Sequence, residues 1–219
     1  MKRIFISGLN SSGTSIIANV LKSFDFINGT KRDDSANCES YPKELINSLE
    51  FIENFNNNLS LKFKNFYKRY EDNKKIILDK TPPHFTKALA FNNLYKDDDN
   101  FFIILQRNPI DALSSWNRRG KHLQMNSVKA MIKFHNYYMN KVNSIYIKYE
   151  CFCKDPIFEI KRLMKFINED VNEEIIKEKC KKFDIEIKHT YDESFILKDE
   201  KDKEKVDILK RLWGYGESI

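Results

Sequence analysis

A turn rich in glycine and hydroxyl side chains, early in the chain, has the composition of an anion-binding loop. It runs Gly8-Leu9-Asn10-Ser11-Ser12-Gly13-Thr14-Ser15, between an apolar segment and a segment with helical spacing. Glycine permits the sharp turn, and the first N–H groups of a helix point towards an anion held at its N-terminus. Hydroxyl donors are added by Ser11, Ser12, Thr14 and Ser15. We predict a phosphate site here, although an ordinary strand-to-helix turn with capping serines has the same composition.

The spacing of this turn fits the nucleotide-binding pattern G-x-x-x-x-G-K-[ST] at every position but one. Thr14 stands where the pattern has lysine. Because that lysine contacts the β- and γ-phosphates of ATP, its replacement counts against ATP chemistry more than against phosphate binding.

Arg107 is a second candidate for binding phosphate. It follows the apolar run 101–105 and precedes Asn108-Pro109. The guanidinium fork suits phosphate oxygens, and proline fits the first turn of a helix. Ser115 then lies roughly two turns along that helix. For Arg107 taken alone, a surface ion pair is the alternative.

The elements that must position these residues follow from the apolar pattern. Short apolar runs separated by helical stretches are typical of buried parallel strands, and they occur at 3–7, 76–78, 101–105 and 144–147. Helices are predicted over residues 15–24, 41–70, 109–119, 127–142, 155–167, 172–182 and 203–213. The alternation indicates a single α/β domain, 1–219, with a doubly wound parallel β-sheet flanked by helices. Ligands bind beyond the carboxyl ends of such strands, so the polar residues that end all four runs are expected in one crevice.

One predicted helix carries an aromatic stripe. Within 41–70, apolar residues recur at three- and four-residue steps, at Leu45, Leu49, Ile52, Phe55, Leu59, Phe63 and Phe66. A stripe with that spacing indicates packing against the core rather than a cofactor site.

Composition limits the classes of function. The formal net charge of +6 over 219 residues favours anionic ligands, but the lysines are scattered, so no nucleic-acid partner is predicted. The four cysteines form no CxxC and no ligand cluster, which indicates inert thiols in a reducing compartment and no metal site. The first twenty residues are too polar for a signal sequence or a membrane span. A cytoplasmic protein is predicted, while the oligomeric state is left open.

The motifs, taken in order, resemble the sulfotransferases that use 3′-phosphoadenosine 5′-phosphosulfate (PAPS). Ser12-Gly13-Thr14-Ser15 resembles their 5′-phosphosulfate loop, and the stretch from Arg107 to Ser115 matches R-x-P-x-D-x-x-x-S. Asp79-Lys80-Thr81-Pro82 resembles a segment of glycan sulfotransferases and bacterial relatives. Tyr149-Glu150 with Asp155-Pro156, and the later Gly214-Tyr215, are also similar to family segments. The resemblance implies a P-loop-type fold, PAPS as co-substrate, adenosine 3′,5′-bisphosphate (PAP) as product, and no metal.

The resemblance also implies roles for residues. Arg107 and Ser115 would hold the 3′-phosphate of the donor, and the amides of Gly13, Thr14 and Ser15 its 5′-phosphate. Many relatives carry a cation where this chain has Ser11, and Lys80 is the candidate to replace it. A solvated lysine is the alternative for Lys80, and Arg118 and Arg119 are alternative cations.

An acceptor hydroxyl or amine, on a glycan or a small molecule, would have to lose a proton to a general base. The candidates are His84, Glu39 and His122, although a lone histidine is also a common structural residue. Two rival functions stay open. A P-loop small-molecule kinase would use Asp79 for magnesium, and a catalytically inactive nucleotide-binding protein with a sulfotransferase fold would bind PAP without transferring anything.

Overall fold

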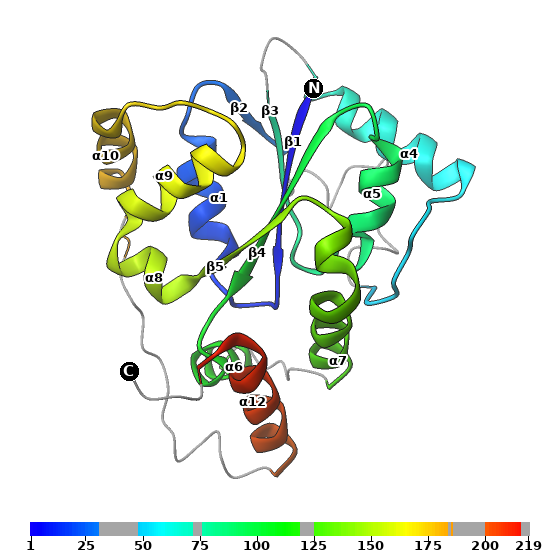
Figure 1. Cartoon of the computed structure of the whole chain (residues 1–219), viewed down its shortest axis with the longest axis vertical. Coiled ribbons are helices and arrows are strands. Elements are labelled where there is room, and N and C mark those ends of the chain that lie inside the picture. The colour runs from blue at the N-terminus through cyan, green and yellow to red at the C-terminus, as the bar shows by residue number, and fades with distance from the viewer. Residues whose placement is uncertain (31–47, 72–75, 119–124, 184, 186–199, 216–219) are drawn as a thin grey trace.

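Five parallel strands form the centre of the molecule, in the spatial order β2-β3-β1-β4-β5. The computed structural model describes residues 1–30, 48–71, 76–118, 125–183, 185 and 200–215 (Figure 1). The strands are β1 (Lys2–Gly8), β2 (Ile27–Gly29), β3 (Ile76–Lys80), β4 (Asp99–Gln106) and β5 (Ser144–Lys148). The predicted α/β class with a doubly wound parallel sheet is confirmed. Among the strands of the described residues, the sequence missed β2, whose three residues are too few to show as an apolar run.

Helices cover both faces of the sheet. They are α1 (Thr14–Lys22), α4 (Asn57–Lys68), α5 (Ala88–Leu94), α6 (Pro109–Asn117), α7 (Met125–Lys133), α8 (Tyr149–Lys154), α9 (Pro156–Phe166), α10 (Glu173–Lys181) and α12 (Glu200–Trp213). Figure 1 shows α1, α8, α9 and α10 on one side of the sheet and α4, α5 and α7 on the other, with α6 and α12 beyond the carboxyl ends of the strands. Within the described residues, none of these helices has the length and apolarity that crossing a membrane requires.

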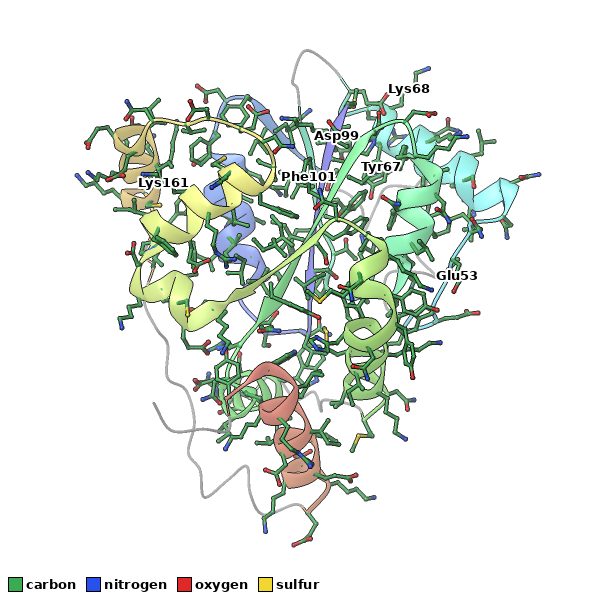
Figure 2. All side chains as sticks on the ribbon, viewed as in Figure 1. Glu53, Tyr67, Lys68, Asp99, Phe101 and Lys161 are labelled. Atoms are coloured by element: carbon green, nitrogen blue, oxygen red, sulfur yellow. The ribbon has the colours of Figure 1, made fainter. Side chains whose placement is uncertain are left out.

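Two apolar cores result from the alternation of side chains along the strands. Phe5 and Phe102 face α4, α5 and α7, and their rings stack with centroids 5.0 Å apart. Ile4 and Ile103 face α1 and α9 on the other side. Figure 2 shows Tyr67 and Phe101 among the interior side chains, whereas Lys161 points away from the body of the molecule. This two-sided burial explains why the strands read as continuous apolar runs.

The helix predicted over 41–70 is wrong in extent. The structure has helix only over Asn57–Lys68, while residues 48–56 are not helical and 41–47 lie outside the described residues. The cause is Asn56, whose side chain accepts a hydrogen bond from the N–H of Leu59 at 2.9 Å and thereby caps α4. The apolar stripe still packs. Phe63 and Phe66 are buried, and the residues before them that lie against the same core are Leu49, Ile52, Phe55 and Leu59.

The segment 48–52 is tied to a 3₁₀ helix, Pro82–Lys87, that follows β3. The N–H of Ile52 donates to the carbonyl of Thr86 at 3.1 Å. The ammonium of Lys87 donates to the carbonyl of Ser48 and, at 2.7 Å, to the hydroxyl of Thr86. Lys87 is only 1% exposed. Burial lowers the pKa of Lys87 from its ordinary value of 10.5 to about 8, although the negative charge of Glu50 acts in the opposite direction.

This buried lysine predicts a dependence of stability on pH. Between about pH 8 and pH 10.5 the unfolded chain binds more protons at Lys87 than the folded chain, so the contribution of this residue to stability rises with pH. We expect the wild-type protein to gain free energy of unfolding relative to Lys87→Met, by up to about 1.4 kcal/mol per pH unit in this window. Urea unfolding at about pH 7.5 and 9.5 measures the difference. An equal difference at both values would contradict the prediction.

Candidate functional site

The first loop joins β1 to α1 through backbone conformations that few residues adopt. The φ angles are 151° at Gly8, 67° at Ser11 and 90° at Gly13. Both the N–H and the hydroxyl of Ser12 donate to the carbonyl of Leu9, at 3.2 and 2.6 Å. These bonds close the loop, and Ser12 is fully buried, so its side chain shapes the loop from inside.

Gly13 is the position where the loop is packed most tightly. A Cβ atom built on Gly13 would lie 2.2 Å from Cδ2 of Tyr149, the residue that begins α8. Gly8 is also confined, because a Cβ atom there would lie 2.6 Å from the carbonyl oxygen of Leu105 in β4. The backbone of the loop therefore packs directly against β4 and against α8, the helix that follows β5.

A cavity of about 350 Å³ opens beside this loop, at the carboxyl ends of β1, β3 and β4. Its lining includes six of the predicted site residues, namely Ser11, Gly13, Thr14, Ser15, Lys80 and Arg107. Tyr149 and Trp116 line it as well. Residues that are more than 65 positions apart in sequence thus meet at one place, as the parallel topology requires.

Arg107 is held rigidly at this cavity. The residue is 7% exposed, and Nη1 donates to the carbonyl of Ser11 at 3.0 Å. The guanidinium carbon lies 4.7 Å from the centroid of the Tyr149 ring, a cation–π contact. The first loop and Arg107 are therefore bound to each other as well as to the same aromatic ring. This arrangement brings a fixed cation to the amides at the start of α1.

Lys80 brings a second cation to the cavity. It is the last residue of β3, and the register of the sheet pairs it with Ile6, two residues before the first loop. Ser7 fixes the turn that follows, because its hydroxyl oxygen accepts the N–H of Phe85 at 2.7 Å and its proton goes to the carbonyl of Pro82. Of the alternatives to Lys80, Arg118 is exposed, and Arg119 lies outside the described residues.

His84 lies in a buried polar cluster rather than on the cavity. Its side chain is 2% exposed, Nδ1 is 3.8 Å from Oδ2 of Asp79, and the ring packs against Phe91 with centroids 4.9 Å apart. Asp79 also accepts hydrogen bonds from the hydroxyls of Tyr67 and, at 3.0 Å, Thr81. The 3₁₀ helix turns His84 inward, and His84 is not among the described residues that line the cavity, so its role as a base stays a prediction.

The other predicted site residues are placed as follows. Ser115 is 9% exposed on α6 and is not among the lining residues of the cavity, although its neighbour Trp116 is. Its contact with a 3′-phosphate stays a prediction. Glu39 and His122 fall outside the described residues. Within the described part of the lining there is no carboxylate or imidazole.

No protein-family model and no curated protein matches this sequence. Solved structures do resemble the chain along most of its length. A sulfotransferase from Alicyclobacillus acidocaldarius has a TM-score of 0.53 at 14% identity, covering 97% of this chain and 95% of that one. This chain has the sulfotransferase fold. A sulfotransferase from Mycobacterium tuberculosis H37Rv gives 0.54 at 11% identity, with coverages of 98% and 76%. The sulfotransferase domain of the Synechococcus PCC 7002 olefin synthase gives 0.52 at 14%, with coverages of 100% and 89%.

Within this sulfotransferase fold, sequence reasoning assigned no role to Tyr149. Burial, followed by a hydrogen bond with Cys153, raises the pKa of Tyr149 to about 12, so its phenol is neutral at physiological pH. Its ring lies against both Gly13 and Arg107. The signal was present in the sequence, because Tyr149 directly follows the strand β5, and residues in that position face the ligand side of a parallel sheet.

Proposed function

We propose that the protein is a sulfotransferase that uses PAPS as its sulfuryl donor and a hydroxyl or amine of a glycan or small molecule as its acceptor. The observation that carries the proposal is the single cavity in which the first loop, Lys80 and Arg107 meet, on a fold shared with solved sulfotransferases. The cytoplasmic location and the one-domain organisation predicted from the sequence are part of the same proposal.

The residues present fit a nucleotide with two separate phosphates. The amides at the start of α1 offer donors to one phosphate, aided by the helix dipole. Arg107 offers a buried guanidinium, whose fork suits phosphate oxygens. Thr14 in the place of the usual lysine disfavours the β- and γ-phosphates of ATP. The fit favours PAPS and PAP over nucleoside triphosphates.

PAPS supplies an activated sulfuryl group whose leaving group is a phosphate. The chain supplies positioning and charge stabilisation, as for phosphoryl transfer. Backbone N–H groups of Gly13, Thr14 and Ser15 orient the 5′-phosphate, and Lys80 stabilises the negative charge that develops on it. Tyr149, with its raised pKa, stays protonated and keeps Arg107 in place instead of accepting a proton. Glu39, His84 and His122 stay the candidates for the base that accepts the proton of the acceptor.

Calorimetric titration with PAP, beside ATP with magnesium, tests the proposal. We expect PAP to bind the wild-type protein and ATP to bind much more weakly. Arg107→Ala should weaken PAP binding about tenfold to a hundredfold, because a hydrogen-bonded charge contact to phosphate is lost. Arg69→Ala is the matched control, since this arginine is exposed and is not among the described residues that line the cavity.

Each other outcome points to one rival function. Preferred binding of ATP with magnesium would favour the small-molecule kinase. Binding of PAP without any turnover of PAPS would favour the inactive nucleotide-binding protein. That alternative was considered because Ser11 stands where many sulfotransferases carry a cation. Failure to bind either nucleotide would overturn the proposed function.

A further inference from the structure

Glu150 joins two distant parts of the chain next to the proposed donor site. Its Oε1 accepts the backbone N–H of Asn108 at 2.7 Å, and its Oε2 accepts the hydroxyl of Tyr215 at 2.5 Å. Asn108 directly follows Arg107 and caps α6 by accepting the N–H of Ile110 at 3.0 Å. The carboxylate therefore holds the turn that carries Arg107.

Tyr215 reaches Glu150 because α12 ends at a fixed place. Trp213 is 3% exposed, Gly214 has a φ of 67°, and the N–H of Tyr215 donates to the carbonyl of Lys210 at 2.9 Å. The ammonium of Lys148 lies 4.7 Å from the centroid of the Tyr215 ring. Burial and the bond to Glu150 raise the pKa of Tyr215, which keeps its phenol a neutral donor.

The adjacent residues Tyr149 and Glu150 thus contact Arg107 and the residue that follows it. The ring of Tyr149 lies beneath the guanidinium, and the carboxylate of Glu150 holds the backbone one residue further along. Glu150 itself is not among the described residues that line the cavity. Its effect on a bound nucleotide must therefore pass through the Arg107–Asn108 turn.

We propose that Glu150 and Tyr215 are positioning residues that hold the Arg107–Asn108 turn in the geometry that binds the 3′-phosphate of the donor. The inference rests on the proposed function of this site. Charge alone predicts the opposite effect, because a carboxylate near an anion site repels the ligand. Removing Glu150 would tighten nucleotide binding if only its charge mattered, and weaken it if positioning matters.

Calorimetry with PAP and with adenosine 5′-monophosphate, which lacks the 3′-phosphate, tests this inference. We expect Glu150→Ala to weaken PAP binding about tenfold, since a charge-assisted bond to the turn is lost, and to leave the affinity for the monophosphate unchanged. Glu150→Gln keeps an oxygen acceptor for Asn108 and should restore most of the PAP affinity. Tyr215→Phe should weaken PAP binding by a smaller factor. Glu178→Ala, which removes an equal charge from an exposed position, should have no effect.

Three results would overturn the inference alone: tighter PAP binding by Glu150→Ala, an equal loss for both nucleotides, or no rescue by Glu150→Gln. Should Glu150→Ala fail to fold, Tyr215→Phe decides the question by the same comparison of the two nucleotides, because it removes a single hydroxyl. A wild-type protein that does not bind PAP would instead overturn the proposed function, and this inference with it, before any substitution is made.

Discussion

Replacing Gly13 with alanine is expected to lower the affinity for PAP at least about a hundredfold. The added Cβ would lie 2.2 Å from the ring of Tyr149, and the φ of 90° at this position disfavours any residue with a side chain. Either the loop or the ring must move. Because the same ring supports Arg107, both phosphate-binding elements would be displaced together. Calorimetric titration with PAP measures the loss.

Gly29→Ala is a matched control for this substitution. A Cβ atom at Gly29 would be similarly crowded, 2.2 Å from Cε and 2.5 Å from both Cδ and Cγ of Lys22, but neither Gly29 nor Lys22 is among the described residues that line the cavity. We expect PAP affinity within about twofold of the wild type. Wild-type affinity in Gly13→Ala would show that Tyr149 does not pack on the loop.

Lys80→Met is expected to lower turnover of PAPS about a hundredfold to a thousandfold. The ammonium is proposed to act on charge that develops only as the bond to the leaving phosphate breaks, so the affinity for PAP should fall by much less than turnover. Hydrolysis of PAPS by water is a suitable assay, because the leaving group is the same whichever acceptor is used. Lys64→Met, on the exposed face of α4, is the control. Unchanged hydrolysis in Lys80→Met would mean that another cation takes this role.

The convergence of the first loop, Lys80 and Arg107 was predictable because each lies within two residues of the end of a run of apolar residues. In a parallel sheet the carboxyl ends of all strands lie at one edge, so the order of residues along the chain is enough to bring them together. No knowledge of side-chain contacts was needed for this step. For the same reason Tyr149, after β5, was expected at this edge of the sheet, although no role was assigned to it.

The inward turn of His84 was not predictable in the same way. It depends on the 3₁₀ helix after β3, which two successive prolines begin, and on the buried carboxylate of Asp79. The inward hydroxyl of Ser12 likewise depends on how the first loop closes on Leu9. The orientations of these side chains result from tertiary packing, which cannot be predicted from the spacing of residue types along the sequence.

The hydrogen bond between Glu150 and Tyr215 was even harder to predict from the sequence, because it joins two residues far apart along the chain. Glu150 lies in α8 and Tyr215 lies just after α12, so α9, α10, a stretch outside the described residues and α12 separate them along the chain. Their pairing requires α12 to dock beyond the carboxyl ends of the strands, as Figure 1 shows. A hydrogen bond of this kind follows only from the assembled fold.

The central place of β1 in the sheet has a consequence for how the protein folds. Lys2 pairs with Ile76 on one side and with Asp99 on the other, so both neighbours of this strand come from far along the chain. Contacts between distant residues cost loop-closure entropy before the strand pairing that offsets this cost has formed. We therefore expect folding on a time scale on the order of milliseconds to seconds rather than microseconds. Until β3 and β4 have been synthesised, β1 is an apolar segment without partners and is prone to aggregate. The cavity beside the first loop lies at the carboxyl ends of β1, β3 and β4, so it can form only after these three strands have paired.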